Sequence, residues 1–219
     1  MLKMKNITKL FLYLNLCLTL LACSKISPKG EIEVKDVTVE NFTKLNLKGD
    51  FKVFFAKGNQ NLVSVETYPN VYKNLDIEVE NGILTIEENR KTDQVDFYNI
   101  TIFGKNDLNE VSLSDKVEMN VSGQVKTPEF SLHLKGNSKF MGAVIAPKSK
   151  IEMAEKSNAN ILGETKNLNL KLADSASIMA PYFYIENLEI LIKNGASAGL
   201  NIDQEMKGTL ENTSKLIFY

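Results

Sequence analysis

Apolar and polar residues alternate along most of the chain after Glu31, and no stretch keeps a helical period for long. Alternation with a period of two is typical of β-strands that bury one face. The pair Asn81-Gly82 separates two alternating segments, which is a strong signal for a β-hairpin. The pattern predicts an all-β fold whose first half has short strands over residues 37–39, 45–47, 51–55, 62–65, 75–79, 84–86 and 96–103.

From Glu110 onward, apolar triplets are separated by clusters of small polar residues. One marker in each cluster gives steps of 23, 19, 18, 21 and 18 residues, the markers being Asp115, Ser138, Ser157, Ser175, Ala196 and Ser214. A repeat of about 20 residues is typical of a solenoid whose stacked rungs share one core. An antiparallel β-sandwich also gives short strands at regular spacing, but the constant order of strand and corner favours a parallel β-helix. Residues 216–219 are expected to form its last rung and to seal the core.

The N-terminus has the pattern of a targeting segment. Three lysines precede an apolar run over residues 10–21, which at roughly twelve residues is too short to span a bilayer that needs about 20. The run ends in Leu20-Leu21-Ala22-Cys23 and resembles the signal of a bacterial lipoprotein. That resemblance implies lipidation of the Cys23 thiol and cleavage between Ala22 and Cys23. An uncleaved signal anchor, or an ordinary signal with a chance cysteine, is the alternative.

These features divide the chain into a signal peptide at residues 1–22, a tether at residues 23–36 and a β-helix domain at residues 37–219. Hydrophobic residues make up 43% and charged residues 24% of the chain, as in an ordinary folded protein. Removal of the signal peptide changes the net charge from −1 to −4. This net charge lacks the basic surplus that binding to nucleic acid requires. It also predicts that the folded domain is not attracted to an acidic membrane surface.

Residues 37–219 resemble the "putative auto-transporter adhesin, head GIN domain" family, which has no known function and is common in Bacteroidetes envelopes. In the first half the resemblance rests on residues 42–47, 49–53 and 75–86, and in the second half on the repeated corners. The family usually has Ser-Gly-Ser-Gly corners, whereas this chain has triplets such as Gly136-Asn137-Ser138. The resemblance implies a right-handed parallel β-helix and a lipid-anchored or surface location, and it brings no catalytic motif.

Candidates for catalysis are few. β-Helical lyases need an Arg or Lys base beside several acids that bind Ca²⁺, and the candidate Arg90 lies in a polar loop before the repeats. Asp115 and Asp174 occupy corners separated by two intervening units, too far apart for the carboxylate pair of a glycoside hydrolase. His133 lies between two leucines, is expected to point outward, and has no second histidine for a zinc site or a Ser–His pair. We therefore expect no catalysis, no metal and no cofactor.

Two tyrosines are the candidate ligand-binding residues. In the segment Pro181-Tyr182-Phe183-Tyr184, an extended backbone directs Tyr182 and Tyr184 to one side and the phenylalanine to the other. Paired exposed tyrosines can stack on sugar rings or on a partner protein. The alternative is that the cluster fills a loop against the solenoid, and the pair Phe97-Tyr98 has the same two interpretations.

Together these features predict an outer-membrane lipoprotein that binds a glycan or an envelope protein and catalyses no reaction. One interpretation is an adhesin displayed on the cell surface. The alternative is a periplasm-facing structural or stress-related lipoprotein that binds another envelope protein. Surface-exported lipoproteins of Bacteroidetes tend to carry acidic residues just after the cysteine, and Ser24-Lys25-Ile26-Ser27 lacks them, which weakens the surface interpretation.

Overall fold

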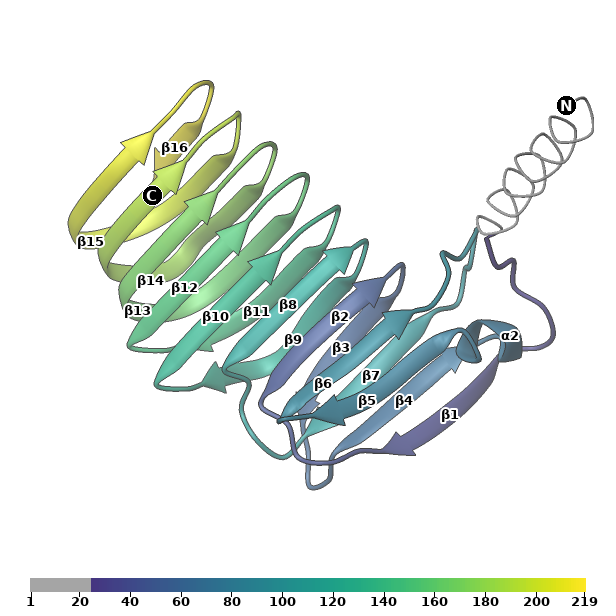
Figure 1. The fold of residues 1–219 in the computed structure, drawn as a ribbon. Coiled ribbons are helices and arrows are strands. Elements are labelled where there is room, and N and C mark those ends of the chain that lie inside the picture. The colour runs from purple at the N-terminus through teal and green to yellow at the C-terminus, as the bar shows by residue number, and fades with distance from the viewer. Residues whose placement is uncertain (1–24) are drawn as a thin grey trace, which may run out of the picture.

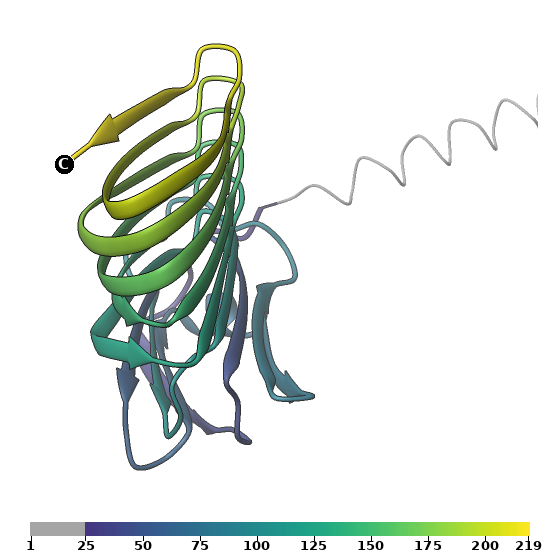
Figure 2. The ribbon, with the colours of Figure 1, turned by 90° about the vertical axis from the view of Figure 1, so that its left-hand side faces the viewer.

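A computed structural model describes residues 25–219, which form an all-β, mostly parallel β-solenoid of about five turns with rungs of about 20 residues (Figure 1). Seen from its C-terminal side, the molecule is a stack of flattened loops (Figure 2). The fold predicted from the repeat is therefore confirmed. The predicted signal peptide, with Ala22 and Cys23, lies outside the described residues.

Each rung contributes a strand to each of two facing parallel sheets, which we name after the side chains on their outer surfaces. The charged sheet contains β6 (Ile83–Glu88), β2 (Lys44–Gly49), β8 (Glu110–Asp115), β10 (Glu129–Leu134), β12 (Lys148–Met153) and the second halves of β13 (Asn158–Leu172), β14 (Ser177–Ile192) and β15 (Ser197–Leu210). The aromatic sheet contains β7 (Asn99–Gly104), β3 (Lys52–Lys57), β9 (Glu118–Lys126), β11 (Lys139–Ile145), the first halves of β13, β14 and β15, and β16 (Lys215–Phe218).

The core consists of columns of apolar side chains that stand in register on successive rungs. One column contains Val111, Leu132, Ile151, Leu170 and Ile190, each at most 2% exposed. Full burial of such a side chain contributes about 1.5–3 kcal/mol. Because a rung contacts only its neighbours, the core exists only when the rungs stack.

Each corner of the repeating part contains a residue with left-handed backbone geometry, at φ between 55° and 72°: Asp115, Gly136, Glu155, Asp174, Asn194 and Asn212. At one corner the following residue, Gly195, also has a positive φ, of 84°. The residue two positions after each of those six points inward, and it is fully buried in five rungs: Val117, Ser138, Ser157, Ala176 and Ala196. Two of the predicted markers were therefore out of register, since Asp115 and Ser175 precede the inward positions of their rungs. The turn and the inward position that follows it both favour small or polar residues. The sequence alone therefore does not show which residue of a corner points inward.

The N-terminal end of the solenoid differs from the repeat because antiparallel strands flank it. On the aromatic sheet, β4 (Leu62–Thr67) pairs with β7 and β1 (Glu33–Thr38) pairs with β4. On the charged sheet, β5 (Leu75–Glu80) pairs with β6 through the predicted hairpin at Asn81 and Gly82, whose φ angles are 50° and 75°. The short helix α2 (Pro69–Tyr72) connects β4 to β5. Among residues 25–219, no helix is long and apolar enough to cross a membrane.

Part of the predicted tether, residues 23–36, is packed against the body of the protein. Ile26 forms a parallel bridge with Thr92, and strand β1 begins at Glu33, ahead of the predicted domain boundary. The contact partners lie tens of residues later in the chain. Local alternation carries no information about such contacts, so the sequence could not indicate where the free segment ends.

The last rung is formed by β16, as predicted, but it does not seal the core. Phe218 stands in register with the buried Leu200 and is itself 58% exposed. Leu210, in register with the buried Ile192, is 44% exposed. Among the described residues, no strand covers the outer edge of β16.

Candidate binding surface

The outer surface of the charged sheet carries acidic and basic side chains that pair across and along its strands. Glu152 on β12 lies 3.0 Å from Lys150, 3.4 Å from Lys171 and 3.3 Å from His133. Partial burial acts to raise the pKa of Glu152, but the bond to Lys150, followed by Lys171 and His133, lowers it overall. Such exposed pairs contribute little to stability, and they leave few charges free for a ligand.

The residues considered for catalysis remain apart from one another. His133 points outward from β10, as predicted, and its charged neighbour is Glu152. Asp115 and Asp174 occupy corners three rung steps apart, about 14 Å at the usual strand spacing of about 4.8 Å. Arg90 lies in the loop after β6, where Asn74 holds its backbone. Among residues 25–219, no group of three or more His, Cys, Asp or Glu side chains is placed to hold a metal ion.

The two predicted binding tyrosines project from β14 on the aromatic sheet. Tyr182 is 66% exposed and Tyr184 is 58% exposed, whereas Phe183 between them is 1% exposed and packs in the core. The alternation read from the sequence is therefore confirmed, and the two phenol rings do not fill a loop against the solenoid. Their role in binding a ligand stays a prediction.

A β-bulge in β14 lies at the two tyrosines. Residues 181–183 have no register partner on β15, because the pairing moves directly from Ala180–Leu200 to Tyr184–Asn201. The Asn201 amide donates a hydrogen bond to the backbone oxygen of Pro181 at 3.2 Å and closes the irregularity. Bulges of this kind redirect side chains and are frequent at functional sites.

A groove of about 530 Å³ opens beside Tyr184, where the chain bends from one sheet to the other. Polar side chains from three successive rungs line it: Glu164, Lys166, Glu186, Asn201 and Asp203. Glu164 and Asp203 are exposed and Glu186 is half-buried, so three carboxylates share the groove with a single lysine. An aromatic ring offers a packing surface for C–H groups, and carboxylate and amide oxygens accept hydrogen bonds from hydroxyl groups.

Methionines extend this surface across neighbouring rungs. Met141 and Met179 are 51% and 44% exposed, and they occupy one outward column of the aromatic sheet with Asn160 between them. The ring of Tyr219 covers Gly199, where an added Cβ would lie 2.8 Å from that ring. The Tyr219 hydroxyl lies 3.1 Å from the Met179 sulfur. Thioether side chains are adaptable in contacts, so this column can accommodate apolar surface of varied shape.

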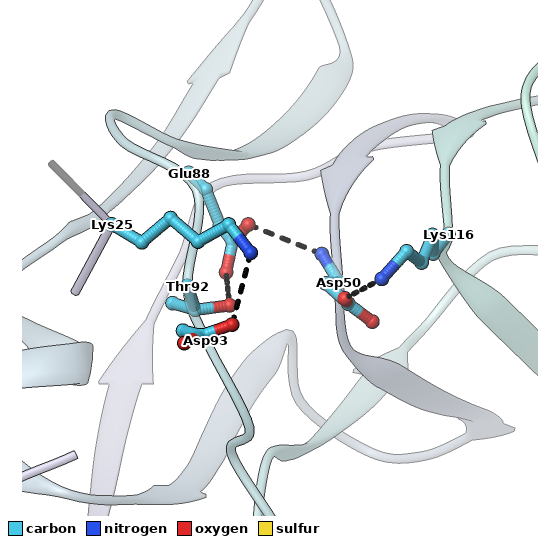
Figure 3. A network of polar contacts seen from close by, with 6 residues as sticks. All are labelled: Lys25, Asp50, Glu88, Thr92, Asp93 and Lys116. Carbon is cyan, nitrogen blue, oxygen red and sulfur yellow. Dashed lines mark hydrogen bonds and ion pairs between the residues drawn. The ribbon is translucent and has the colours of Figure 1, made fainter. Parts of the chain in front are cut away.

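A second hollow, of about 540 Å³, lies on the corner side near the N-terminal end, and part of its polar lining forms a bonded network (Figure 3). Lys116 donates to Asp50 at 2.6 Å, the Asp50 backbone N–H donates to Glu88 at 3.2 Å, and the Thr92 hydroxyl donates to Glu88 at 3.0 Å. Burial raises the pKa of Glu88, and the bonds from Thr92 and Asp50 oppose that effect. The network ties the first corner to the loop after β6, and we assign it a structural role.

The pair Phe97-Tyr98 is divided between surface and core. Tyr98 is 4% exposed and packs on Phe51 with ring centroids 5.4 Å apart, whereas Phe97 is 45% exposed. Burial, followed by the neighbouring Glu88 carboxylate, raises the pKa of Tyr98 well above its usual range. Tyr98 therefore belongs to the core and is not available to a ligand.

The sequence predicted the two exposed tyrosines but not the polar side chains that line the groove beside Tyr184. Glu164, Glu186 and Asp203 are scattered over 40 residues of sequence, and only the stacking of rungs brings them beside Tyr184. The repeat of about 20 residues is the signal that could have aligned part of the set, because Glu164 and Tyr184 stand in register. The bulge shifts the register by three residues before Asn201, so the repeat alone does not align that residue.

Comparison with known proteins gives a family and a fold. The chain matches the family model described as "Putative auto-transporter adhesin, head GIN domain" over residues 41–219. A comparison with curated proteins finds no match. Among solved structures, the chain is similar to a protein described as a "putative adhesin" from Bacteroides fragilis, with a TM-score of 0.71, 13% identity and coverage of 89% of this chain and 100% of that chain.

Two structures from Parabacteroides distasonis are also similar. One is described as a "putative adhesin", with a TM-score of 0.62 and 13% identity. The other is described as a "putative lipid binding protein", with a TM-score of 0.61 and 16% identity. Each similarity covers 90% of this chain and 100% of the other, and at such identities it shows the fold alone. Because the family model covers most of the chain, the protein belongs to the "putative auto-transporter adhesin, head GIN domain" family.

Proposed function

We propose that the protein is a lipid-anchored, non-catalytic binding module of the cell envelope that recognises a carbohydrate through the groove beside Tyr184. The observation that carries the proposal is the position of an exposed tyrosine ring at a groove with three carboxylates and a side-chain amide. A sugar presents C–H groups on its ring faces and hydroxyl groups at its edges. The tyrosine ring matches the first chemistry and the polar side chains match the second.

The exposure of the groove supports binding over catalysis. A glycosidase needs a general acid whose pKa is raised by an apolar environment. Glu164 and Asp203 are exposed to solvent, and the groove is open where the chain bends between the sheets. Water therefore solvates carboxylates that a hydrolase would hold in a closed pocket.

The test is a glycan panel probed with the mature protein in detergent. Tyr184→Ala should weaken binding to the best glycan about tenfold, because it removes the ring at the groove. Phe54→Ala is the matched control, since Phe54 is 47% exposed on the same sheet but several rungs away. Equal binding by the two variants, or no glycan bound by the parent protein, would refute the proposal.

The lipid anchor is the second part of the proposal and has its own test. The lipobox-like sequence that ends at Cys23 supports it, and several acyl chains on one residue make a firm anchor. Cys23→Ala should release the protein from the outer-membrane fraction. Protease digestion of the anchored protein on intact cells would place it on the surface, whereas protection until the outer membrane is opened would place it on the periplasmic side.

An envelope protein is the second candidate ligand. The exposed column of Met141 and Met179 favours it, because methionine-rich surfaces adapt to varied apolar partners. Loss of partner capture on Met179→Ala, with glycan binding unchanged, would distinguish this ligand from a carbohydrate.

A further inference from the structure

Three segments that are distant in the sequence meet at the N-terminal end of the solenoid: residues 25–30, 69–74 and 89–93. The Lys29 backbone N–H donates to the Asn70 side chain at 2.8 Å and joins the first segment to the second. The Asn74 amide donates to the backbone oxygen of Arg90 at 2.6 Å and joins the second segment to the third. The Ile26 bridge to Thr92 joins the third segment to the first. The segments therefore form one surface, which we call the basic end.

The basic end has a charge opposite to that of the rest of the protein. It contains five exposed basic side chains, Lys25, Lys29, Lys73, Arg90 and Lys91, and a single acid, Asp93. Lys25 pairs with Asp93 at 2.9 Å, and the other four basic groups have no carboxylate partner among residues 25–219. Since the mature chain carries a net charge of −4, the remaining surface is strongly acidic.

The proposed anchor lies next to this surface. Only Ser24 separates Cys23 from Lys25 in the sequence, so their Cα atoms are at most about 7 Å apart. The headgroup layer of each leaflet is roughly 5–8 Å thick. A lipidated Cys23 therefore brings Lys25 and the loop bonded to it within reach of the headgroups.

We propose that the basic end docks on the anionic headgroups of the membrane that holds the lipid anchor, so that the solenoid projects away from the bilayer. The inference rests on the proposed lipidation of Cys23. Basic groups near an anionic surface are attracted within about a Debye length, and the acidic remainder of the protein is repelled. Anchor and charge thus favour one orientation.

This orientation presents the groove to the outside. On the aromatic sheet, β14 lies five strands beyond β7, which follows the basic end in the sequence and is flanked on its other side by β4 and β1. At about 4.8 Å per strand, Tyr184 would stand about 24 Å farther from the membrane than β7. Figure 1 shows the N-terminal strands and the last rungs at opposite ends of the stack.

The test uses single-cysteine fluorescent labels on the lipidated protein in vesicles of phosphatidylethanolamine and phosphatidylglycerol with a headgroup quencher. A lipidated Cys23 has no free thiol, so an introduced cysteine is the single labelling site. Asn89→Cys labels the basic end and Glu211→Cys labels the last corner, both exposed positions. Quenching of the Asn89 label should exceed that of the Glu211 label at least threefold. Equal quenching, in protein that floats with the vesicles, would overturn the proposal.

A longer linker separates docking from simple tethering. About 15 Gly and Ser residues inserted between Ser24 and Lys25 allow a separation of about 20 Å. If the basic end docks, the Asn89 label stays quenched on these vesicles at low salt and is released by Lys73→Gln with Lys91→Gln. If the insertion alone abolishes quenching, docking is refuted. Protein that fails to float shows that the anchor itself is absent, and glycan binding is measured independently.

Discussion

In the repeating rungs each buried side chain packs on the side chain at the equivalent position of the next rung. At the N-terminal end the contacts join different segments and are not repeated from rung to rung. The column through Ile151 has the same apolar character in every rung it crosses. The N-terminal end instead depends on individual polar bonds, such as those from Asn74 to the backbone of Arg90. The solenoid is therefore stabilised by repetition and its N-terminal end by specific pairing. We expect the two regions to respond differently to mutation and to pH.

The largest effect is expected in the middle of the repeat. Ile151→Ala removes a fully buried side chain between two neighbours of its column, and it should lower the free energy of unfolding by about 2–5 kcal/mol. Urea denaturation measures the change. Lys150→Ala, at the adjacent exposed position, should change stability by less than about 0.5 kcal/mol. Similar losses for the two variants would contradict a core built from columns.

At the N-terminal end, Asn74→Ala should cost about 1–3 kcal/mol, because it leaves the backbone groups of Arg90 without their partner. Asn74 is 4% exposed, so water replaces these bonds poorly. Hydrogen exchange should show faster opening of residues 89–93 with little change beyond β10. Asn89→Ala, at an exposed position in the same loop, is the control. If opening spread evenly through the stack, the two regions would not be independent.

A stabilising substitution is expected at one corner. Glu155 has φ 63°, in the left-handed region that costs a residue with a Cβ about 1–2 kcal/mol. Glu155→Gly should therefore raise the free energy of unfolding by about 0.5–1 kcal/mol. The reverse change at the equivalent corner, Gly136→Ala, should be destabilising, because the new Cβ would lie 2.5 Å from the backbone oxygen of Asp115. Thermal melts of the two variants should shift in opposite directions.

The smallest expected effect is a difference in pH dependence between the two regions. The folded pKa of Glu88 is raised, so its contribution to stability decreases as pH rises from its ordinary value of 4.5 toward the folded value. The folded pKa of Glu152 is lowered, so its contribution is present above 4.5 and is lost as pH falls through the folded value. Urea melts between pH 3 and 7 should show opposite changes in slope for Glu88→Gln and Glu152→Gln. Changes of the same sign would contradict the assigned environments.

The sequence predicted the repeating part well, because its fold follows from local alternation and a regular period. The exposed Tyr182 and Tyr184 and the buried Phe183 follow from the same alternation. The basic end was not predictable in this way, because the contacts that assemble it join residues between 16 and 66 positions apart in the sequence. The net charge of the chain did not reveal this cluster either, because an average over all residues conceals a local concentration of one sign.

The groove was only partly predictable for a related physical reason. Glu164 and Tyr184 are in register, so the period could have brought them together. Asp203 lies at a second register shift, between the pairs Ile185–Ile202 and Asn187–Glu205, so the period does not place it in the groove. A bulge interrupts the repeat, so its position cannot be predicted from the length of the repeat.

Hydrogen exchange of the protein, measured with and without the glycan that binds best, tests whether the groove beside Tyr184 is the binding surface. Binding in the groove should slow exchange at residues 181–186 and 201–203 and leave residues 129–134 and 148–153 on the charged sheet unchanged. Protection on the charged sheet, or no protected segment at a saturating glycan concentration, would contradict the assignment of the aromatic sheet as the binding surface.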